Sequence, residues 1–158
     1  MSTLKTSTPK PQEKSVLDQI SEYKHPEMIE RLKRKHDLSH EEAKQLFEDT
    51  LLFLFLCTVT KKPVSPSPMI DIGWHEFLMY TRDYQEFCRV HFGKFIHHTP
   101  TPTLGVQPME KEVLSSKETK KLALKFFGEV SDNWTATKNA ECCPEFDCHG
   151  DDSCGGDV

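Results

Sequence analysis

Residues 39–56 read SHEEAKQLFEDTLLFLFL, and this stretch decides the fold. Ser39 followed by Glu42 forms the S-x-x-E pattern of a helix capping box, so a helix is expected to begin here. Apolar side chains then recur at helical spacing, and the run from Leu51 to Leu56 is apolar on every side. A helix without a polar face is normally buried all round, so we expect this one at the centre of the core.

Further helices are predicted on both sides of this centre. They comprise a short segment from Val16, an amphipathic helix from Pro26, a long helix from Met69 to Gly93, and a last helix opened by the capping box of Ser115 and Glu118. No convincing run of alternating strand residues is found. The expected fold is therefore all-α, a small bundle of four to five helices over residues 15–135.

The two ends of the chain differ in composition from this body. Residues 1–14 are rich in Ser, Thr, Pro and Lys, and we expect them to be disordered. Residues 136–158 form a Cys-rich, acidic tail without a hydrophobic pattern. The chain has 20 Lys and Arg against 25 Asp and Glu, a net charge of −5. Because residues 139–158 hold six carboxylates and no Lys or Arg, the rest is nearly neutral, which argues against nucleic-acid binding.

Membrane and secreted classes are also disfavoured. The longest apolar run, residues 51–59, is about half of what a bilayer span needs. The first residues lack the apolar core of a secretion signal, and six cysteines in such a chain suggest a reducing compartment. These features predict a cytoplasmic protein.

The densest chemistry in the body lies between residues 71 and 98. The pattern D-x-x-W-H, then Tyr and Cys four residues apart, is similar to that of the glycine-rich domain-containing protein-like family, over about residues 40–98. It is carried by Asp71, Trp74, His75, Tyr84 and Cys88. The resemblance implies a helical domain, often followed by a Gly- or Cys-rich segment. Where the family often has a second histidine, this chain has Phe77, which argues against a family metal site that uses that histidine.

Asp71 and His75 are four residues apart, so on a helix they share a face and can hydrogen-bond. A carboxylate that holds one imidazole nitrogen fixes which nitrogen faces outward. Three interpretations remain: a buried structural pair beside Trp74, a metal site, and acid–base catalysis.

His97 and His98 can join this pair only if the helix is broken. An unbroken helix from His75 to Phe92 spans about 25 Å. The five residues that lead to His97 can return at most about 17 Å. A break near Thr81 would allow a shared site, whereas exposed histidines in a Pro/Thr loop are the alternative.

The tail offers a second candidate site for zinc or another thiophilic metal. Its ligands would be Cys142, Cys143, Cys148, His149 and Cys154. Because no C-x-x-C pair is present, the alternatives are a redox-active or modified Cys142–Cys143 pair and an inert tail.

These observations favour a helical binding or accessory module with a metal-capable tail and a protein partner. They lean away from an enzyme, because no phosphate loop, nucleophile elbow or complete H-E-x-x-H motif occurs. Two alternatives are a small metal-dependent enzyme centred on Asp71 and His75, and a tail that is itself a substrate for modification.

Overall fold

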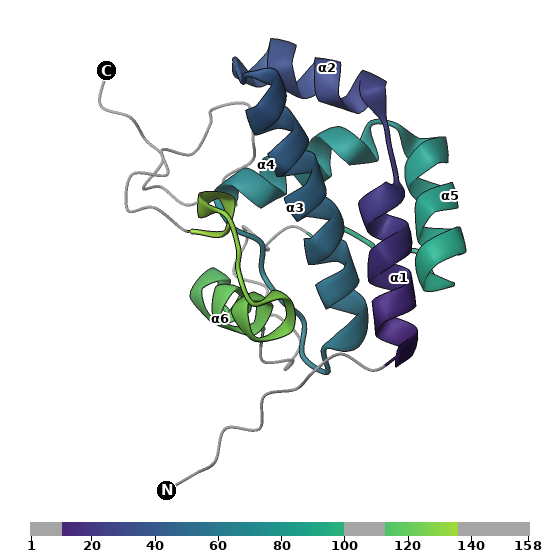
Figure 1. Ribbon diagram of the computed structural model, residues 1–158, viewed down its shortest axis with the longest axis vertical. Coiled ribbons are helices and arrows are strands. Elements are labelled where there is room, and N and C mark those ends of the chain that lie inside the picture. Colours follow the sequence, from purple (N-terminus) through teal and green to yellow (C-terminus); the bar gives the residue numbers. More distant parts are fainter. Residues whose placement is uncertain (1–10, 100–112, 136–158) are drawn as a thin grey trace, which may run out of the picture.

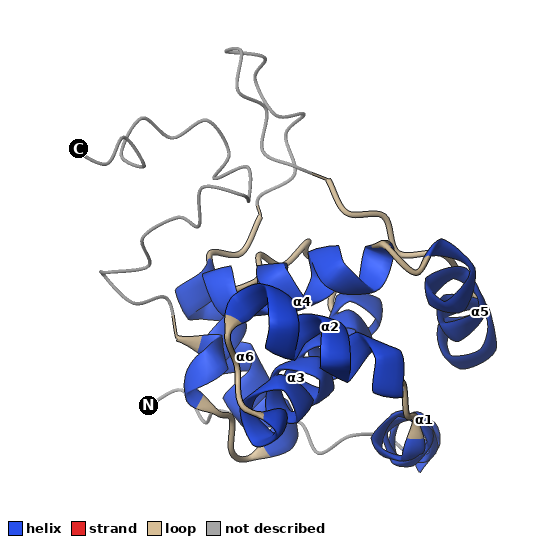
Figure 2. Cartoon of the chain, turned by 90° about the horizontal axis from the view of Figure 1, so that it is seen from above, coloured by secondary structure: helices blue, strands red, loops and turns tan. Residues whose placement is uncertain are grey.

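Six α-helices and one short 3-10 helix make up the part of the chain that the computed structural model describes, residues 11–99 and 113–135. They are α1 (Pro11–Glu22), α2 (Pro26–His36), α3 (His40–Val59), α4 (Pro68–Leu78), α5 (Thr81–Phe92), α6 (Ser116–Phe127) and η1 (Asp132–Trp134). Within these ranges Val64 and Leu114 form an isolated bridge and no strand occurs (Figure 2). The all-α class is therefore confirmed.

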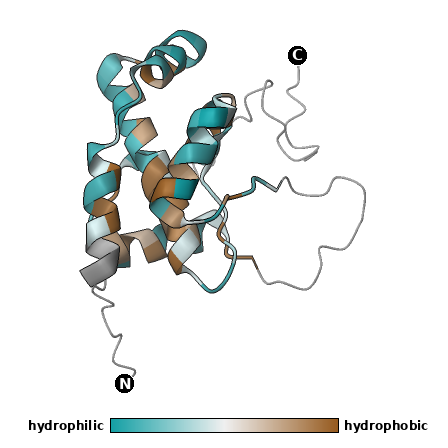
Figure 3. Cartoon of the chain, turned by 90° about the vertical axis from the view of Figure 1, so that its right-hand side faces the viewer, coloured by the Kyte–Doolittle hydropathy of each residue, from teal (hydrophilic) through white to brown (hydrophobic). Residues whose placement is uncertain are grey.

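Helix α3 is the centre of the fold. It packs against α1, α2, α4 and η1, and Figure 1 shows it running through the middle of the molecule. The capping box of Ser39 and Glu42 is present at its start, as predicted. The run from Leu51 to Leu56 is buried apart from the partly exposed Leu52. Hydrophobic residues gather toward the middle of the molecule in Figure 3, in agreement with a core built around this helix.

The helix expected from Met69 to Gly93 is two helices, which is one reason why the helix count exceeds four or five. The chain turns at Met79 and Tyr80, where the Tyr80 amide donates to the Phe77 carbonyl at 3.0 Å. The turn lets the Phe77 ring meet Tyr84 edge-on, with ring centroids 5.2 Å apart. An unbroken helix of this length would reach about 36 Å and carry its second half past the core. Packing therefore overrides local helix propensity here.

The first helix also begins earlier than expected. Helix α1 starts at Pro11, inside the segment predicted to be disordered, and proline suits the first turn of a helix. Residues 1–10 and the tail from residue 136 onward lie outside the described residues. None of the described helices combines the length and the apolar character that crossing a membrane requires.

A buried carboxylate joins α2 to α4. Glu76 is 2% exposed and accepts hydrogen bonds from Arg31, from Lys35 at 3.0 Å and from His36 at 3.3 Å. Burial by itself raises the pKa of Glu76, but the hydrogen bonds from Arg31, Lys35 and His36 and the charge of Arg31 outweigh this effect, so the net pKa falls below its ordinary value. The carboxylate is thus held in its charged form.

This arrangement predicts a pH-dependent contribution to stability. A carboxyl group with a lowered pKa in the folded state stabilises the fold above its unfolded pKa, and the contribution is lost as the pH falls through the folded pKa. We expect Glu76→Gln to lower the free energy of unfolding at pH 7. The loss should be only about 1–2 kcal/mol, because Arg31 and Lys35 are partly exposed and water can replace part of their interaction with the carboxylate. Urea denaturation between pH 7 and pH 3 should show the gap between the two proteins closing toward acid. Glu30→Gln, at an exposed pair with Lys33, is the control and should change stability by less than about 0.5 kcal/mol. A gap that stays constant with pH would contradict this assignment.

Candidate metal centre

Asp71, His75 and His98 meet on one side of α4. Helix α4 begins where the Ser67 hydroxyl accepts a hydrogen bond from the Ile70 amide, and Pro68 occupies its first turn. Asp71 and His75 follow one turn apart on this helix. His98 comes from the extended segment after α5, and it reaches the other two because the chain turns at Met79 and Tyr80.

The Asp71 carboxylate is hydrogen-bonded to His98. The His98 Nε2 group donates to Asp71 Oδ1 at 2.7 Å. His75 Nδ1 donates to the main-chain carbonyl of Asp71 at 3.0 Å and lies 3.5 Å from its Oδ2 atom. The direct hydrogen bond that the sequence predicts between the Asp71 carboxylate and His75 is therefore made to His98 instead.

The three side chains offer the donor atoms of a metal site. One ligand atom from each lies within 4.8 Å of those of the other two. In a tetrahedral zinc site neighbouring ligand atoms are about 3.4 Å apart, so metal binding would need small side-chain movements and release to solvent of the Nε2 proton that His98 donates to Asp71. The Nδ1–H group of His75 is bound to a backbone carbonyl, which leaves the lone pair of the neutral ring on Nε2. This is the outer hydrogen bond that metal-binding histidines commonly make.

The site is enclosed but open to solvent on one side. The side chains of Asp71 and His98 are 12% and 11% exposed, whereas that of His75 is 33% exposed. The His98 ring lies between those of Trp74 and His75, with centroid distances of 4.4 and 4.3 Å. The Trp74 and His75 rings restrict the position of the His98 ring. The exposed edge of His75 lets solvent reach the site.

The other residues singled out in the body take different places. Tyr84 is fully buried, and its hydroxyl accepts a hydrogen bond from the Trp74 indole at 3.0 Å. Cys88 is buried one turn further along α5, and burial raises the pKa of its thiol. His97 is exposed and its ring packs on Phe95, so the structure separates it from the cluster that His98 joins. Sequence spacing alone could not choose between these two adjacent histidines.

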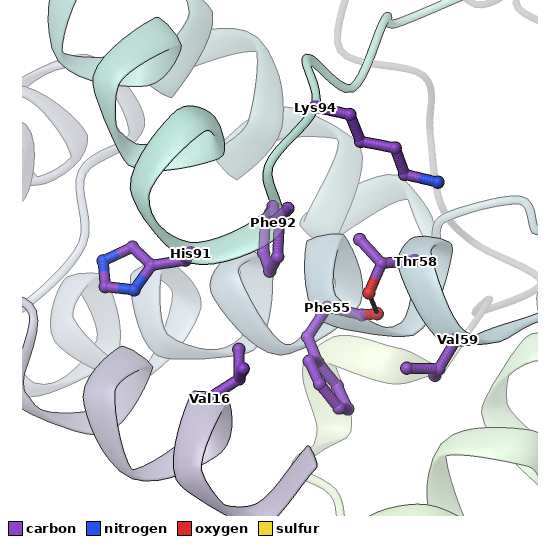
Figure 4. Close-up of a pocket in the computed structure, with 7 residues that line it drawn as sticks. All are labelled: Val16, Phe55, Thr58, Val59, His91, Phe92 and Lys94. Carbon is purple, nitrogen blue, oxygen red and sulfur yellow. Dashed lines mark hydrogen bonds between the residues drawn. The ribbon is translucent and has the colours of Figure 1, made fainter. Parts of the chain in front are cut away.

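A recess of about 360 Å³ lies elsewhere, between α1, α3 and α5 (Figure 4). Its walls include Val16, Phe55 and Phe92, with His91 and Lys94 at its edges. The Nδ1 atom of His91 is buried and makes no hydrogen bond within the described residues, and burial lowers the pKa of this histidine. The recess contains no carboxylate and none of the three candidate ligands, so it is separate from the candidate metal centre.

Comparison with known proteins identifies a family for this chain. A family model described as UCP032817-like matches residues 15–124. No match is found among curated proteins or among solved structures. The resemblance to the glycine-rich domain-containing protein-like family is therefore wrong, because it depended on a few positions within a short range, whereas the matching model covers most of the chain. The candidate tail ligands, from Cys142 to Cys154, lie outside the described residues.

Proposed function

The chain belongs to the UCP032817-like family, and we propose that its helical body is a metal-binding module with Asp71, His75 and His98 as ligands. One observation carries this proposal. Two imidazoles and a carboxylate, drawn from two separate segments, converge within 4.8 Å. A structural Asp–His pair needs only one histidine, whereas this cluster supplies a second.

The donor set favours a divalent transition metal. Imidazole nitrogens suit zinc, iron, copper and nickel, and a carboxylate oxygen completes sets that bind zinc. Zinc is our first candidate, because both nitrogen and oxygen ligands fit it without a demand on d-electron geometry. The site in the body replaces the tail as the main metal site of the proposal, and metal binding by the tail stays a separate prediction.

Three protein ligands leave a coordination position for water or another molecule. This count is typical of catalytic zinc, whereas structural zinc usually has four protein ligands. A metal-dependent enzyme is therefore the second candidate function, with the metal supplying Lewis-acid chemistry to a bound oxygen. The exposed edge of His75 supports this alternative.

We also propose that this metal-binding module acts as an accessory protein. We expect a protein partner and a cytoplasmic location, which the free thiols of Cys57 and Cys88 support. In that setting, a metal-free Asp71–His98 pair would serve only to hold the segment after α5 against α4. Metal analysis separates the two interpretations.

The test is zinc binding by a full-length variant in which Cys142, Cys143, Cys148 and Cys154 are serine, here called the tail-serine protein. We expect it to retain about one equivalent of zinc after gel filtration, without a His-tag. His98→Ala in this protein should weaken zinc binding by at least about 100-fold, because a direct ligand is lost.

His97→Ala is the matched control, since it removes the adjacent exposed histidine. It should leave zinc affinity unchanged within about threefold, with both variants equally helical by circular dichroism. Equal binding by the His98→Ala protein would contradict the proposed site. Loss of all zinc from the tail-serine protein would move the metal to the tail.

A further inference from the structure

The segment that carries His98 has no helix or strand to hold it. Helix α5 ends at Phe92, and Gly93 follows in the left-handed conformation at φ 69°, which ends the helix. From Gly93 to Thr99 the chain has no regular secondary structure. A ligand on such a segment is placed accurately only if other groups fix the backbone.

The Tyr84 hydroxyl fixes this backbone two residues before His98. It donates to the Ile96 carbonyl at 2.5 Å and accepts from the Trp74 indole at 3.0 Å. Tyr84 is fully buried, and Ile96 is 9% exposed. One hydroxyl therefore connects the backbone that leads to His98 with Trp74, the residue directly before His75 on α4.

Cys88 lies beside the same part of the chain. Its thiol is fully buried one turn after Tyr84, and the Ile96 backbone and the Tyr84 side chain lower the pKa of this thiol against the larger raising effect of burial. Tyr84 and Ile96 therefore both border the Cys88 thiol. The spacing of four residues places the Tyr84 and Cys88 side chains on one face of α5.

We infer that Tyr84 is a positioning residue of the metal site, because its hydroxyl fixes the Ile96 backbone from which His98 reaches Asp71. The inference depends on the proposed function, since it assigns a role around the same three ligands. It explains Tyr84 as the partner of the D-x-x-W-H pattern. That pattern supplies Asp71 and His75, and Tyr84 fixes the segment that supplies His98.

Tyr84 should strengthen metal binding because it keeps the extended segment ordered before the metal binds. If the segment were free, binding would have to order it, and the lost conformational freedom would weaken affinity. Groups that orient metal ligands typically change affinity by 10–100-fold when they are removed. The Tyr84 hydroxyl acts through His98 and is not itself a ligand.

Zinc affinity of the Tyr84→Phe variant, in the tail-serine protein, tests the inference. We expect a loss of about tenfold or more, because the change removes one hydroxyl and keeps the ring. Tyr80→Phe is the matched control, since its hydroxyl donates to the Glu27 carbonyl at 3.3 Å on an exposed surface. Its affinity should stay within about threefold of the starting protein.

A second control separates positioning from general stability. Phe87 is buried in the core on the same helix, and its side chain has no group that could hydrogen-bond to Ile96. Phe87→Leu should therefore lower the melting temperature but leave zinc affinity unchanged. If Tyr84→Phe does not fold, Cys88→Ala, which removes the buried thiol that borders Tyr84 and Ile96, replaces it, with an expected loss of at least about fivefold. Unchanged affinity in a folded Tyr84→Phe protein would overturn this inference alone. Absence of zinc from the tail-serine protein without further substitution would overturn the proposed function and this inference with it.

Discussion

Replacing Asp49 by alanine is expected to lower the free energy of unfolding by about 3–5 kcal/mol. The Asp49 side chain lies on α3 with the residue only 2% exposed. Its Oδ1 atom accepts from the Trp134 indole at 3.0 Å, and its Oδ2 atom accepts from Ser131 at 2.6 Å and from Asn133 at 2.9 Å. Alanine would leave these donors without their acceptor and open a cavity beside Trp134, and both effects are destabilising.

Urea denaturation followed by circular dichroism measures this loss. Glu48→Ala is the matched control, because Glu48 is the neighbouring acid on the same helix and is partly exposed. It should change stability by less than about 0.5 kcal/mol. A loss below about 1 kcal/mol for Asp49→Ala would show that the 131–134 segment contributes little to the fold, contrary to the burial of Trp134.

The local signals of the helices could be read from the sequence with good accuracy. The capping boxes at Ser39 and Ser115, and Pro26 at the start of α2, are where they were expected. Each signal depends on hydrogen bonds within one turn, so the surrounding fold is not needed to interpret it. The buried role of α3 was equally clear, because a helix with no polar face can only lie inside.

The break between α4 and α5 could not be predicted in the same way. Neither glycine nor proline occurs from Trp74 to Phe92, and Tyr80 caps α5 without a side-chain hydrogen bond. The turn depends on tertiary packing, in which Phe77 contacts both Tyr84 and Phe87. Spacing did define the condition for a shared site, a broken helix, but only the fold shows that His98 meets it and His97 does not.

Glycine at position 73 depends on a similarly close packing. A Cβ atom at Gly73 would lie 2.1 Å from the Thr50 Oγ1 atom, and 3.4 Å from the nearest atom of Leu46. Thr50 is fully buried, its hydroxyl donates to the Leu46 carbonyl at 2.8 Å, and a β-branched side chain has little rotamer freedom in a helix. Helix α4 can therefore approach α3 this closely only because residue 73 has no side chain.

Gly73→Ala is expected to lower the free energy of unfolding by about 2–3 kcal/mol. Alanine favours a helix over glycine by about 1 kcal/mol, but the clash with Thr50 costs about 3–4 kcal/mol because α4 must move away from α3. The clash has a single main source, so removing it should reverse the sign. In a Thr50→Ala background the nearest remaining atoms are 3.4 Å away, and Gly73→Ala should be neutral or slightly stabilising.

A double-mutant cycle measured by urea denaturation tests this, with Thr50→Val as the matched background that keeps an atom in the place of Oγ1. The Gly73→Ala change should cost as much in the valine background as in the natural protein, and the coupling to Thr50→Ala should be at least about 2 kcal/mol. Because Gly73 lies between Asp71 and His75, movement of α4 also changes their approach to His98. In the tail-serine protein, zinc affinity should therefore fall in Gly73→Ala and recover together with stability when Thr50 becomes alanine. Recovery of stability without recovery of zinc binding would show that the metal ligands do not depend on the α3–α4 distance.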